Sequence, residues 1–316
     1  MGMDMEKWAL VFPGQGSQFV GMGEDLFASY PLFGEIFSRA REVTGVDIAR
    51  LCREGPVAEL DATVNTQLAV LTFELAAYEV FRAHIPAEPA AAAGHSLGEY
   101  SALYASGALT LEEAVLIVQA RAKRHQEALP PGIGAMAALL GPNSAEAAEI
   151  CRACSLPDEP LDLANLNAPN QIVISGDARA IARVEAQGGG KRVKKFVSLP
   201  ISVPCHSRLL TAAAEHFRAD LEKVSFHPPR IPVLPNYDPA RRHTPETSRE
   251  LLRLQMISPV RWQETVERML AMGITTFVEI GPRRVLSGLI KNIDRRPRLV
   301  YIGDKESLDR AVSTWD

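Results

Sequence analysis

The sequence predicts an α/β protein with a hydrolase-like core, built on a parallel sheet, and an inserted ferredoxin-like small subdomain. Apolar runs of strand length alternate with helical segments along the chain, which is typical of an α/β sheet. A Gly-x-Ser-x-Gly motif at 94–98 has the spacing of the nucleophile elbow of hydrolase-like folds. Residues 133–199 follow the order β-α-β-β-α-β of a ferredoxin-like unit, which leaves 1–132 and 200–316 to the large domain.

Composition excludes several classes of protein. The 316 residues are 47% hydrophobic and 23% charged with a net charge of -4, so no broad basic surface for nucleic acid is expected. No apolar run approaches the ~20 residues of a membrane span, and the N-terminus lacks a secretory pattern, which predicts a cytoplasmic location. The four cysteines predict neither a disulfide framework nor a metal site, because Cys151 and Cys154 have no second ligand pair nearby.

The first strand is expected at Trp8–Phe12, and the loop Pro13-Gly-Gln-Gly-Ser-Gln18 follows it. This loop lacks the third glycine of a dinucleotide fingerprint and the Gly-Lys-Ser/Thr of a phosphate-binding loop. It can still present backbone N–H groups and Gln15 to an anion, although composition alone favours a plain turn. Helices are expected next at 22–30, 32–44 and 66–83.

A strand is expected just before the elbow, although the alanine-rich residues 86–93 are poor strand formers. Ser96 needs strained backbone angles at the elbow, and glycine at 94 and 98 removes side chains that would collide. The helix that follows, closed by Gly107, directs N–H groups and its positive dipole end toward the serine. These features indicate a serine nucleophile, while the motif alone is also compatible with a simple glycine-rich turn.

Arg121 occupies an unusual place on its helix. Thr110 and Glu113 form a capping box that opens a helix to about residue 129. Arg121 continues the apolar face of that helix, where a guanidinium requires an anionic partner. A structural salt bridge and a carboxylate ligand gripped by the fork of the guanidinium both explain this position. The residues alone favour the salt bridge.

The remaining elements complete both domains. In the insert we expect strands at 134–140, 161–165, 171–175 and 192–199, and helices at 144–153 and 178–187, the second ended by the glycines at 188–190. After it we expect helices at 209–223, 245–256, 259–272 and 284–292, and strands at 275–280 and 298–302. Ligands of α/β sheets bind at the carboxyl ends of strands, where the elbow, the Gln15 loop and the segment before His206 all lie.

A serine nucleophile requires a base, and His206 is the favoured one of the seven histidines. It ends a strand-like segment before a helix and follows the serine in chain order, as in hydrolases. Cys205 is expected to be buried packing, because adjacent residues in extended backbone point to opposite faces. No acidic third member is evident: Asp158, Asp162 and Asp177 all lie in the insert, and a carbonyl group could orient His206 instead.

Several motifs occur in a fixed order along the chain: Phe12-Pro-Gly-Gln-Gly-Ser-Gln18, Gly94-His-Ser-Leu-Gly-Glu-Tyr100, Gln119-Ala-Arg-Ala-Lys123, Asn165-x-Asn167 with Gln171-Ile-Val-Ile-Ser-Gly176, Ser202-Val-Pro-Cys-His206 and Val278-Glu-Ile-Gly-Pro282. On these motifs the chain, from about residue 7 to 302, resembles the malonyl-coenzyme A:acyl carrier protein transacylase family, including stand-alone polyketide acyltransferases. Together the motifs are highly specific.

The resemblance implies roles for individual residues. Ser96 matches the nucleophile that takes the acyl group, and His206 matches its base. Gln255 matches the residue whose main-chain carbonyl orients the histidine. This carbonyl would take the place of the acidic third member. Gln15 and the N–H of Leu97 match the oxyanion hole.

Further residues match the substrate-binding and docking positions of the family. Arg121 matches the arginine that grips the free carboxylate of a malonyl group, which reverses the preference for a salt bridge. Asn165 and Cys205 fall in motifs beside the substrate pocket. Lys194 and Lys195 match a basic pair that faces the acidic carrier protein in relatives, and a solvated strand face explains the same pair equally well.

The implied activity is transfer of a malonyl group from malonyl-CoA, through an acyl-serine, to the phosphopantetheine thiol of an acyl carrier protein, for fatty acid or polyketide biosynthesis. No permanently bound cofactor and a monomer are expected. The alternatives are an acyltransferase or editing hydrolase for another acyl-CoA or acyl-carrier thioester, and a non-catalytic docking module. The intact set of Ser96, Arg121 and His206 argues against the docking module.

The chain departs from the family pattern at three places. Cys205 replaces a common serine, Arg283-Arg284 replaces a common Gly-Lys, and His125 is atypical on the Arg121 helix. We expect the first departure to affect acyl selectivity, and the other two to affect the pocket entrance or carrier recognition.

Overall fold

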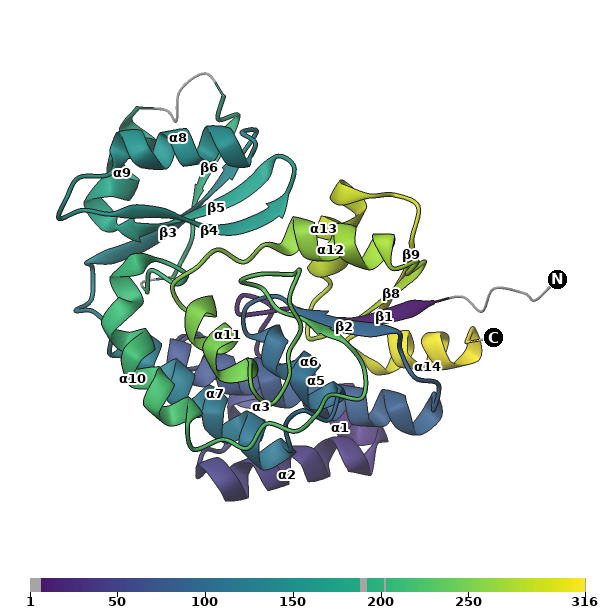
Figure 1. Ribbon diagram of the computed structural model, residues 1–316. Coiled ribbons are helices and arrows are strands. Elements are labelled where there is room, and N and C mark those ends of the chain that lie inside the picture. The colour runs from purple at the N-terminus through teal and green to yellow at the C-terminus, as the bar shows by residue number, and fades with distance from the viewer. Residues whose placement is uncertain (1–6, 188–191, 202, 316) are drawn as a thin grey trace.

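A five-stranded, fully parallel sheet forms the centre of the larger unit (Figure 1). The computed structural model describes residues 7–187, 192–201 and 203–315. The strands of this sheet, from edge to edge, are β7 (Val233–Leu234), β2 (Ala91–Gly94), β1 (Trp8–Phe12), β8 (Thr276–Ile280) and β9 (Arg298–Ile302). The parallel α/β architecture predicted from the sequence is therefore confirmed.

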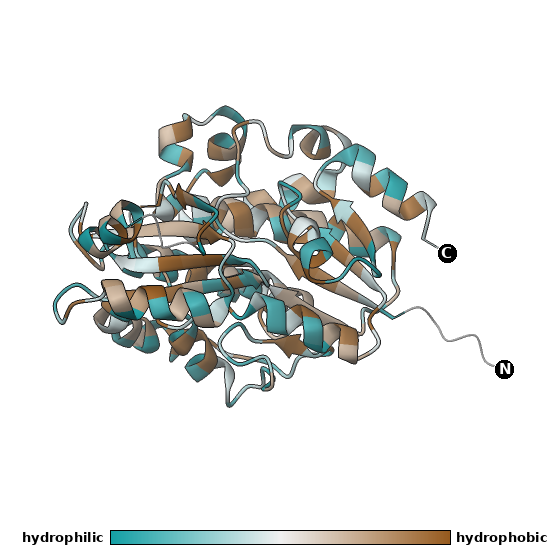
Figure 2. Cartoon of the chain, turned by 90° about the horizontal axis from the view of Figure 1, so that it is seen from above, coloured by the Kyte–Doolittle hydropathy of each residue, from teal (hydrophilic) through white to brown (hydrophobic). Residues whose placement is uncertain are grey.

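Both faces of the parallel sheet are covered by helices. Alternate residues of β1 enter different cores: Leu10 and Phe12 join the cluster beneath most of the helices, whereas Ala9 and Val11 join the cluster of α12 (Trp262–Ala271) and α13 (Leu286–Ile293). The other helices of this unit are α1 (Glu24–Ser29), α2 (Pro31–Thr44), α3 (Ile48–Glu54), α4 (Val57–Leu60), α5 (Thr63–His84), α6 (Gly98–Ala105), α7 (Leu111–Gln126), η1 (Arg208–Leu210), α10 (Thr211–Leu221), α11 (Ser248–Gln255) and α14 (Lys305–Ser313). Seen from above, brown strands lie between helices that alternate brown and teal (Figure 2).

A second, four-stranded antiparallel sheet has the order β4-β5-β3-β6 and forms the smaller unit at the upper left of Figure 1. Its elements in chain order are β3 (Gly134–Leu140), α8 (Ser144–Cys154), β4 (Leu161–Ala168), β5 (Gln171–Asp177), α9 (Ala178–Ala186) and β6 (Lys195–Ser198). One face packs on α8 and α9, where the free thiols Cys151 and Cys154 are core residues. The other face, including Met136 and Ala164, packs near Cys205.

The alanine-rich segment before the elbow is a strand despite its weak propensity. Ala91, Ala92 and Ala93 are fully buried and pair with β1 and β7. Small side chains suit this position because helix α6 approaches closely: a Cβ added at Gly98 would lie 2.1 Å from the carbonyl oxygen of Phe12. Burial in a parallel sheet outweighs the intrinsic preference of alanine.

Sequence reasoning missed the short elements. Helices α3, α4 and α14 and the two-residue strand β7 were not expected. Helix α14 begins at a capping box of Asp304 and Ser307, a pattern that sequence inspection could have recognised. The glycines at 188–190 and Ser202 lie outside the described residues. Among the described helices, none is long and apolar enough to cross a membrane.

Candidate active site

The predicted site residues meet at the carboxyl ends of β1 and β2, around a cavity of about 70 Å³. Seven of them line it: Gln15, Ser96, Leu97, Arg121, Asn165, Cys205 and His206. Gln255 stands behind His206, and its side chain reaches the same cluster. Lys194 and Lys195 do not line the cavity.

The backbone of Ser96 adopts the left-handed conformation, with φ 54°. A side chain on either flanking glycine would collide with backbone: a Cβ at Gly94 would lie 1.8 Å from the carbonyl carbon of Gly98. Such strain persists only where the surroundings hold it, and it exposes the serine oxygen at the start of α6.

Ser96, His206 and Gln255 form a hydrogen-bonded relay. The main-chain carbonyl of Gln255 accepts a hydrogen bond from His206 Nδ1 at 2.7 Å, which fixes the proton on Nδ1. The other nitrogen, Nε2, lies 2.8 Å from Ser96 Oγ and accepts the hydroxyl proton. The geometry is that of a nucleophile and its general base, with a carbonyl in place of the carboxylate.

Burial keeps His206 uncharged. Desolvation, followed by the positive charge of Arg121, lowers the pKa of His206 to about 3. The imidazole is therefore neutral over the physiological pH range, with a free lone pair toward Ser96. That is the protonation state a general base requires.

Leu97 and Gln15, the two residues expected to bind an oxyanion, both line the cavity. The N–H of Leu97 has no acceptor among the described residues, and Gln15 lines the same cavity from the loop after β1. The N–H of Ser96 itself is not such a donor, because it binds Asn236 Oδ1 at 2.6 Å. Leu97 and Gln15 therefore remain the predicted donors of an oxyanion hole.

Arg121 is a buried cation with no anionic partner among the described residues. Its guanidinium donates to Gln67 Oε1 at 2.6 Å, to Ser96 Oγ at 3.0 Å and to Gln255 Oε1 at 3.1 Å. It also stacks over the ring of Tyr100, and its Nε has no partner within the described part of the chain. Because only 2% of Arg121 is exposed and no described carboxylate pairs with it, the structural salt bridge is absent and the guanidinium is available to an anionic ligand.

A buried polar network holds the elbow, and sequence reasoning missed most of it. Asn236 accepts from Ser96 N and donates to the Gly94 carbonyl at 2.6 Å. Glu99 accepts from Asn236 N at 3.0 Å and from the Gln255 side chain at 2.7 Å, and His243 bonds its other oxygen at 2.7 Å. The position of Asn236 just after a strand could have indicated its role. That strand, β7, has only two residues, which is too short to recognise from the sequence.

Residues of β4, in the smaller unit, reach the cavity. Asn165 on β4 lines the cavity, and the neighbouring Asn167 bonds His95 Nε2 at 2.8 Å. The expectation that Cys205 is buried packing holds in part: its side chain packs beside Met136 and Ala164 but also lines the cavity with His206. The rule of opposite faces fails there because His206 has φ 62° and lies in a turn. Burial raises the pKa of the Cys205 thiol to about 11, which disfavours its thiolate.

The departures from the family pattern lie in different surroundings. His125 is fully buried and donates to the Arg121 carbonyl at 2.9 Å, so the expectation that it affects the pocket entrance or carrier recognition is wrong. Arg283 and Arg284 are exposed, and the Arg283 guanidinium lies 5.0 Å from the ring centre of Phe19.

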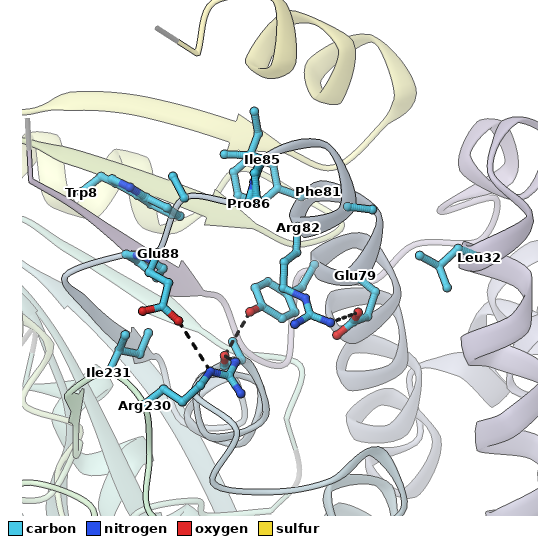
Figure 3. A pocket seen from close by; sticks show the side chains of 15 residues that line it. Trp8, Leu32, Glu79, Phe81, Arg82, Ile85, Pro86, Glu88, Arg230 and Ile231 are labelled. Atoms are coloured by element: carbon cyan, nitrogen blue, oxygen red, sulfur yellow. Dashed lines mark hydrogen bonds and ion pairs between the residues drawn. The ribbon is translucent and has the colours of Figure 1, made fainter.

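A larger cavity of about 440 Å³ lies at the opposite end of the sheet, near the start of β1 and the end of α5 (Figure 3). Its charged side chains pair with each other, Arg82 with Glu79 at 2.9 Å and Arg230 with Glu88 at 3.8 Å. It contains no serine, cysteine or histidine, so the smaller cavity at Ser96 remains the candidate active site.

The chain is similar to known acyl transferases over most of its length. Residues 9–297 match the family model described as the acyl transferase domain. The malonyl CoA-acyl carrier protein transacylase of Escherichia coli O157:H7 is 41% identical over 92% of this chain and 93% of its own length. The transacylase structure from Xanthomonas oryzae pv. oryzae superposes with a TM-score of 0.95 at 39% identity, over 99% of both chains. A malonyl-transacylase in complex with its type II PKS acyl-carrier protein gives 0.94 at 36% identity, over 97% of this chain and 99% of that one. The chain therefore belongs to the acyl transferase domain family.

Proposed function

We propose that this protein transfers malonyl groups from malonyl-CoA to the phosphopantetheine thiol of an acyl carrier protein, with Ser96 as nucleophile. The relatives at about 40% identity are named for this activity. The observation that carries the substrate assignment is the guanidinium of Arg121, buried beside Ser96 with only neutral partners. A malonyl carboxylate supplies the missing anion, whereas an apolar acyl group leaves the charge unpaired at a cost of several kcal/mol.

The geometry supports a ping-pong mechanism. Ser96 Oγ attacks the thioester carbonyl while its proton passes to His206 Nε2, and the oxyanion binds the N–H of Leu97 and Gln15. The tetrahedral intermediate expels the thiol of coenzyme A, which takes the proton from His206. The carrier thiol then gives its proton to His206 and attacks the acyl-serine, and the reverse steps free Ser96.

We also propose that the larger unit is a hydrolase-like core and that residues 133–199 are a ferredoxin-like subdomain. The parallel sheet with an elbow after β2 supports the first assignment. The chain order β3-α8-β4-β5-α9-β6 and a separate apolar core support the second. A cytoplasmic location and a monomer stay predictions.

The nucleophile is tested by intact mass. Incubation with malonyl-CoA is expected to add one malonyl group to the wild-type chain, and peptide mapping is expected to place it on Ser96. The Ser96→Ala variant should remain unmodified, and the Asn236→Ser variant should be acylated more slowly, because it weakens only the hold on the elbow. A wild-type chain that stays unmodified would remove the basis for the transferase.

The role of Arg121 is tested by substrate preference. Arg121→Ala is expected to lower kcat/KM for malonyl-CoA about 10²–10⁴-fold, the equivalent of losing a buried charge pair of about 3–5 kcal/mol. Transfer from acetyl-CoA should persist, because that acyl group has no carboxylate. The control is Arg124→Ala on the same helix, whose guanidinium pairs with Asp220 rather than with site residues. If malonyl preference survives in Arg121→Ala, the carboxylate grip is wrong.

The electrostatic effect of Arg121 on the base is tested by pH. Since the positive charge lowers the pKa of His206, the uncharged Arg121→Met variant should have a higher His206 pKa than the wild type. The acidic limb of Ser96 labelling by a neutral fluorophosphonate should therefore move to higher pH in Arg121→Met and stay in place in Arg124→Met. An acidic limb that is identical in all three proteins would show that Arg121 does not act on His206.

Lys194 and Lys195 are proposed to contact the acidic carrier protein. Both are exposed, and neither makes an ion pair with any other described residue. Their charge reversal to glutamate should slow transfer to the carrier more than self-acylation by malonyl-CoA. The control reverses Lys223 and Lys291, two exposed lysines that change the net charge equally. Equal slowing of both half-reactions would reject the docking role.

A further inference from the structure

The candidate site contains a second strained residue besides Ser96. His206 has φ 62°, a conformation that costs a residue other than glycine on the order of 1–3 kcal/mol. The backbone N–H of His206 donates to the Met256 carbonyl at 3.1 Å, and its ring donates to the Gln255 carbonyl. These bonds hold the backbone N–H and the ring of His206. The residues that follow His206 must be held by other contacts.

One carboxylate holds both residues that follow His206. Asp162 Oδ2 accepts from Ser207 Oγ at 2.8 Å and from Arg208 N at 2.9 Å, and Oδ1 accepts from Arg208 Nε at 2.8 Å. Ser207 is fully buried and caps the short helix η1, so its position is set by this contact. Charge-assisted hydrogen bonds of this kind are stronger than neutral ones.

Asp162 belongs to the inserted unit, and its strand is itself fixed to the active-site side of the larger unit. Residues of β4 exchange backbone hydrogen bonds with Val260, from Leu166 N at 2.9 Å and to the Ala164 carbonyl at 2.8 Å. Farther along the strand, Asn167 bonds His95, the neighbour of the nucleophile. Strand β4 therefore gives Asp162 a fixed position relative to both the serine and the histidine.

We propose that Asp162 is a positioning residue, which holds the strained turn at His206 so that Nε2 stays within reach of Ser96 Oγ. The inference rests on the proposed function of the two catalytic residues. Displacement of a catalytic group by about 1 Å can cost about 10² in rate. The substrate grip is independent of Asp162, because Gln67, Gln255 and Tyr100 hold Arg121.

The chain offers matched variants that separate positioning from simple support. Asp162→Ala removes the hydrogen bonds that the Asp162 carboxylate accepts from Ser207 and Arg208. Asp162→Asn keeps an oxygen that can accept from Ser207 Oγ and Arg208 N, as Oδ2 does. Arg208→Ala removes the ion pair, whose arginine side chain is 67% exposed, and keeps both bonds to Oδ2.

The experiment measures malonylation of Ser96 by rapid quench over a range of malonyl-CoA concentrations, together with thermal unfolding. Asp162→Ala is expected to lower the acylation rate constant about 10–10²-fold with KM for malonyl-CoA unchanged. Asp162→Asn and Arg208→Ala are expected to stay within about 3-fold of the wild type, since they retain the bonds to the turn. The low-field proton resonance of His206 Nδ1 should shift only in Asp162→Ala.

Separate outcomes overturn separate claims. If Ser96 of the wild type is not malonylated, the proposed function fails, and if His206→Ala acylates Ser96 at the wild-type rate, the role of His206 as base fails. If His206→Ala is inactive and Asp162→Ala matches the wild type, or if Arg208→Ala loses as much rate as Asp162→Ala, the positioning role is wrong. Should Asp162→Ala not fold, Ser207→Ala, which removes one bond to Oδ2 and the cap of η1 but no charge, must lower the rate constant at unchanged KM. A wild-type rate in Ser207→Ala would then overturn the proposal.

Discussion

The conformation of Ser96 is the constraint on which the rest of the site depends. Its positive φ requires glycine at 94 and 98, because side chains there would meet backbone within about 2 Å. Strain alone does not hold a serine in place, and the Asn236 side chain supplies the hold by bonding the N–H of Ser96 and the carbonyl of Gly94. The bond also occupies the N–H of Ser96, so that under the proposed roles the oxyanion binds Leu97 and Gln15 instead.

The buried polar network beneath the elbow is better explained by a role in function than by a contribution to stability. Buried polar groups rarely stabilise a fold more than apolar packing of the same shape. Here Glu99 and Gln255 connect the elbow to the segment that orients His206, with hydrogen bonds of 2.7 to 3.0 Å. Each catalytic element is thus fixed against another, and a rigid arrangement of this kind lowers the reorganisation that a reaction would otherwise require.

The sequence predicts the parallel α/β fold and brings out the residues whose local pattern is distinctive. Ser96 lies in a spaced glycine motif, and His206 follows it in chain order, although the strand-like run expected before His206 is not a strand in the described residues. Arg121 is noticed from its helix face, but its role depends on the absence of a carboxylate partner, which only the folded chain shows. The contacts of Asn236 and Asp162 are not predictable from the sequence, because they join residues 140 and 45 positions apart. No local periodicity encodes such contacts.

The charges of the site link substrate recognition to basicity under the proposed roles. The positive charge of Arg121 lowers the pKa of His206 after the larger effect of burial. A malonyl carboxylate bound to Arg121 offsets that charge, so the histidine gains proton affinity when the correct acyl group is in place. An acetyl group leaves the guanidinium unpaired and the histidine a weaker base. Selection of the dicarboxylic acyl group therefore operates on the rate of proton transfer as well as on binding.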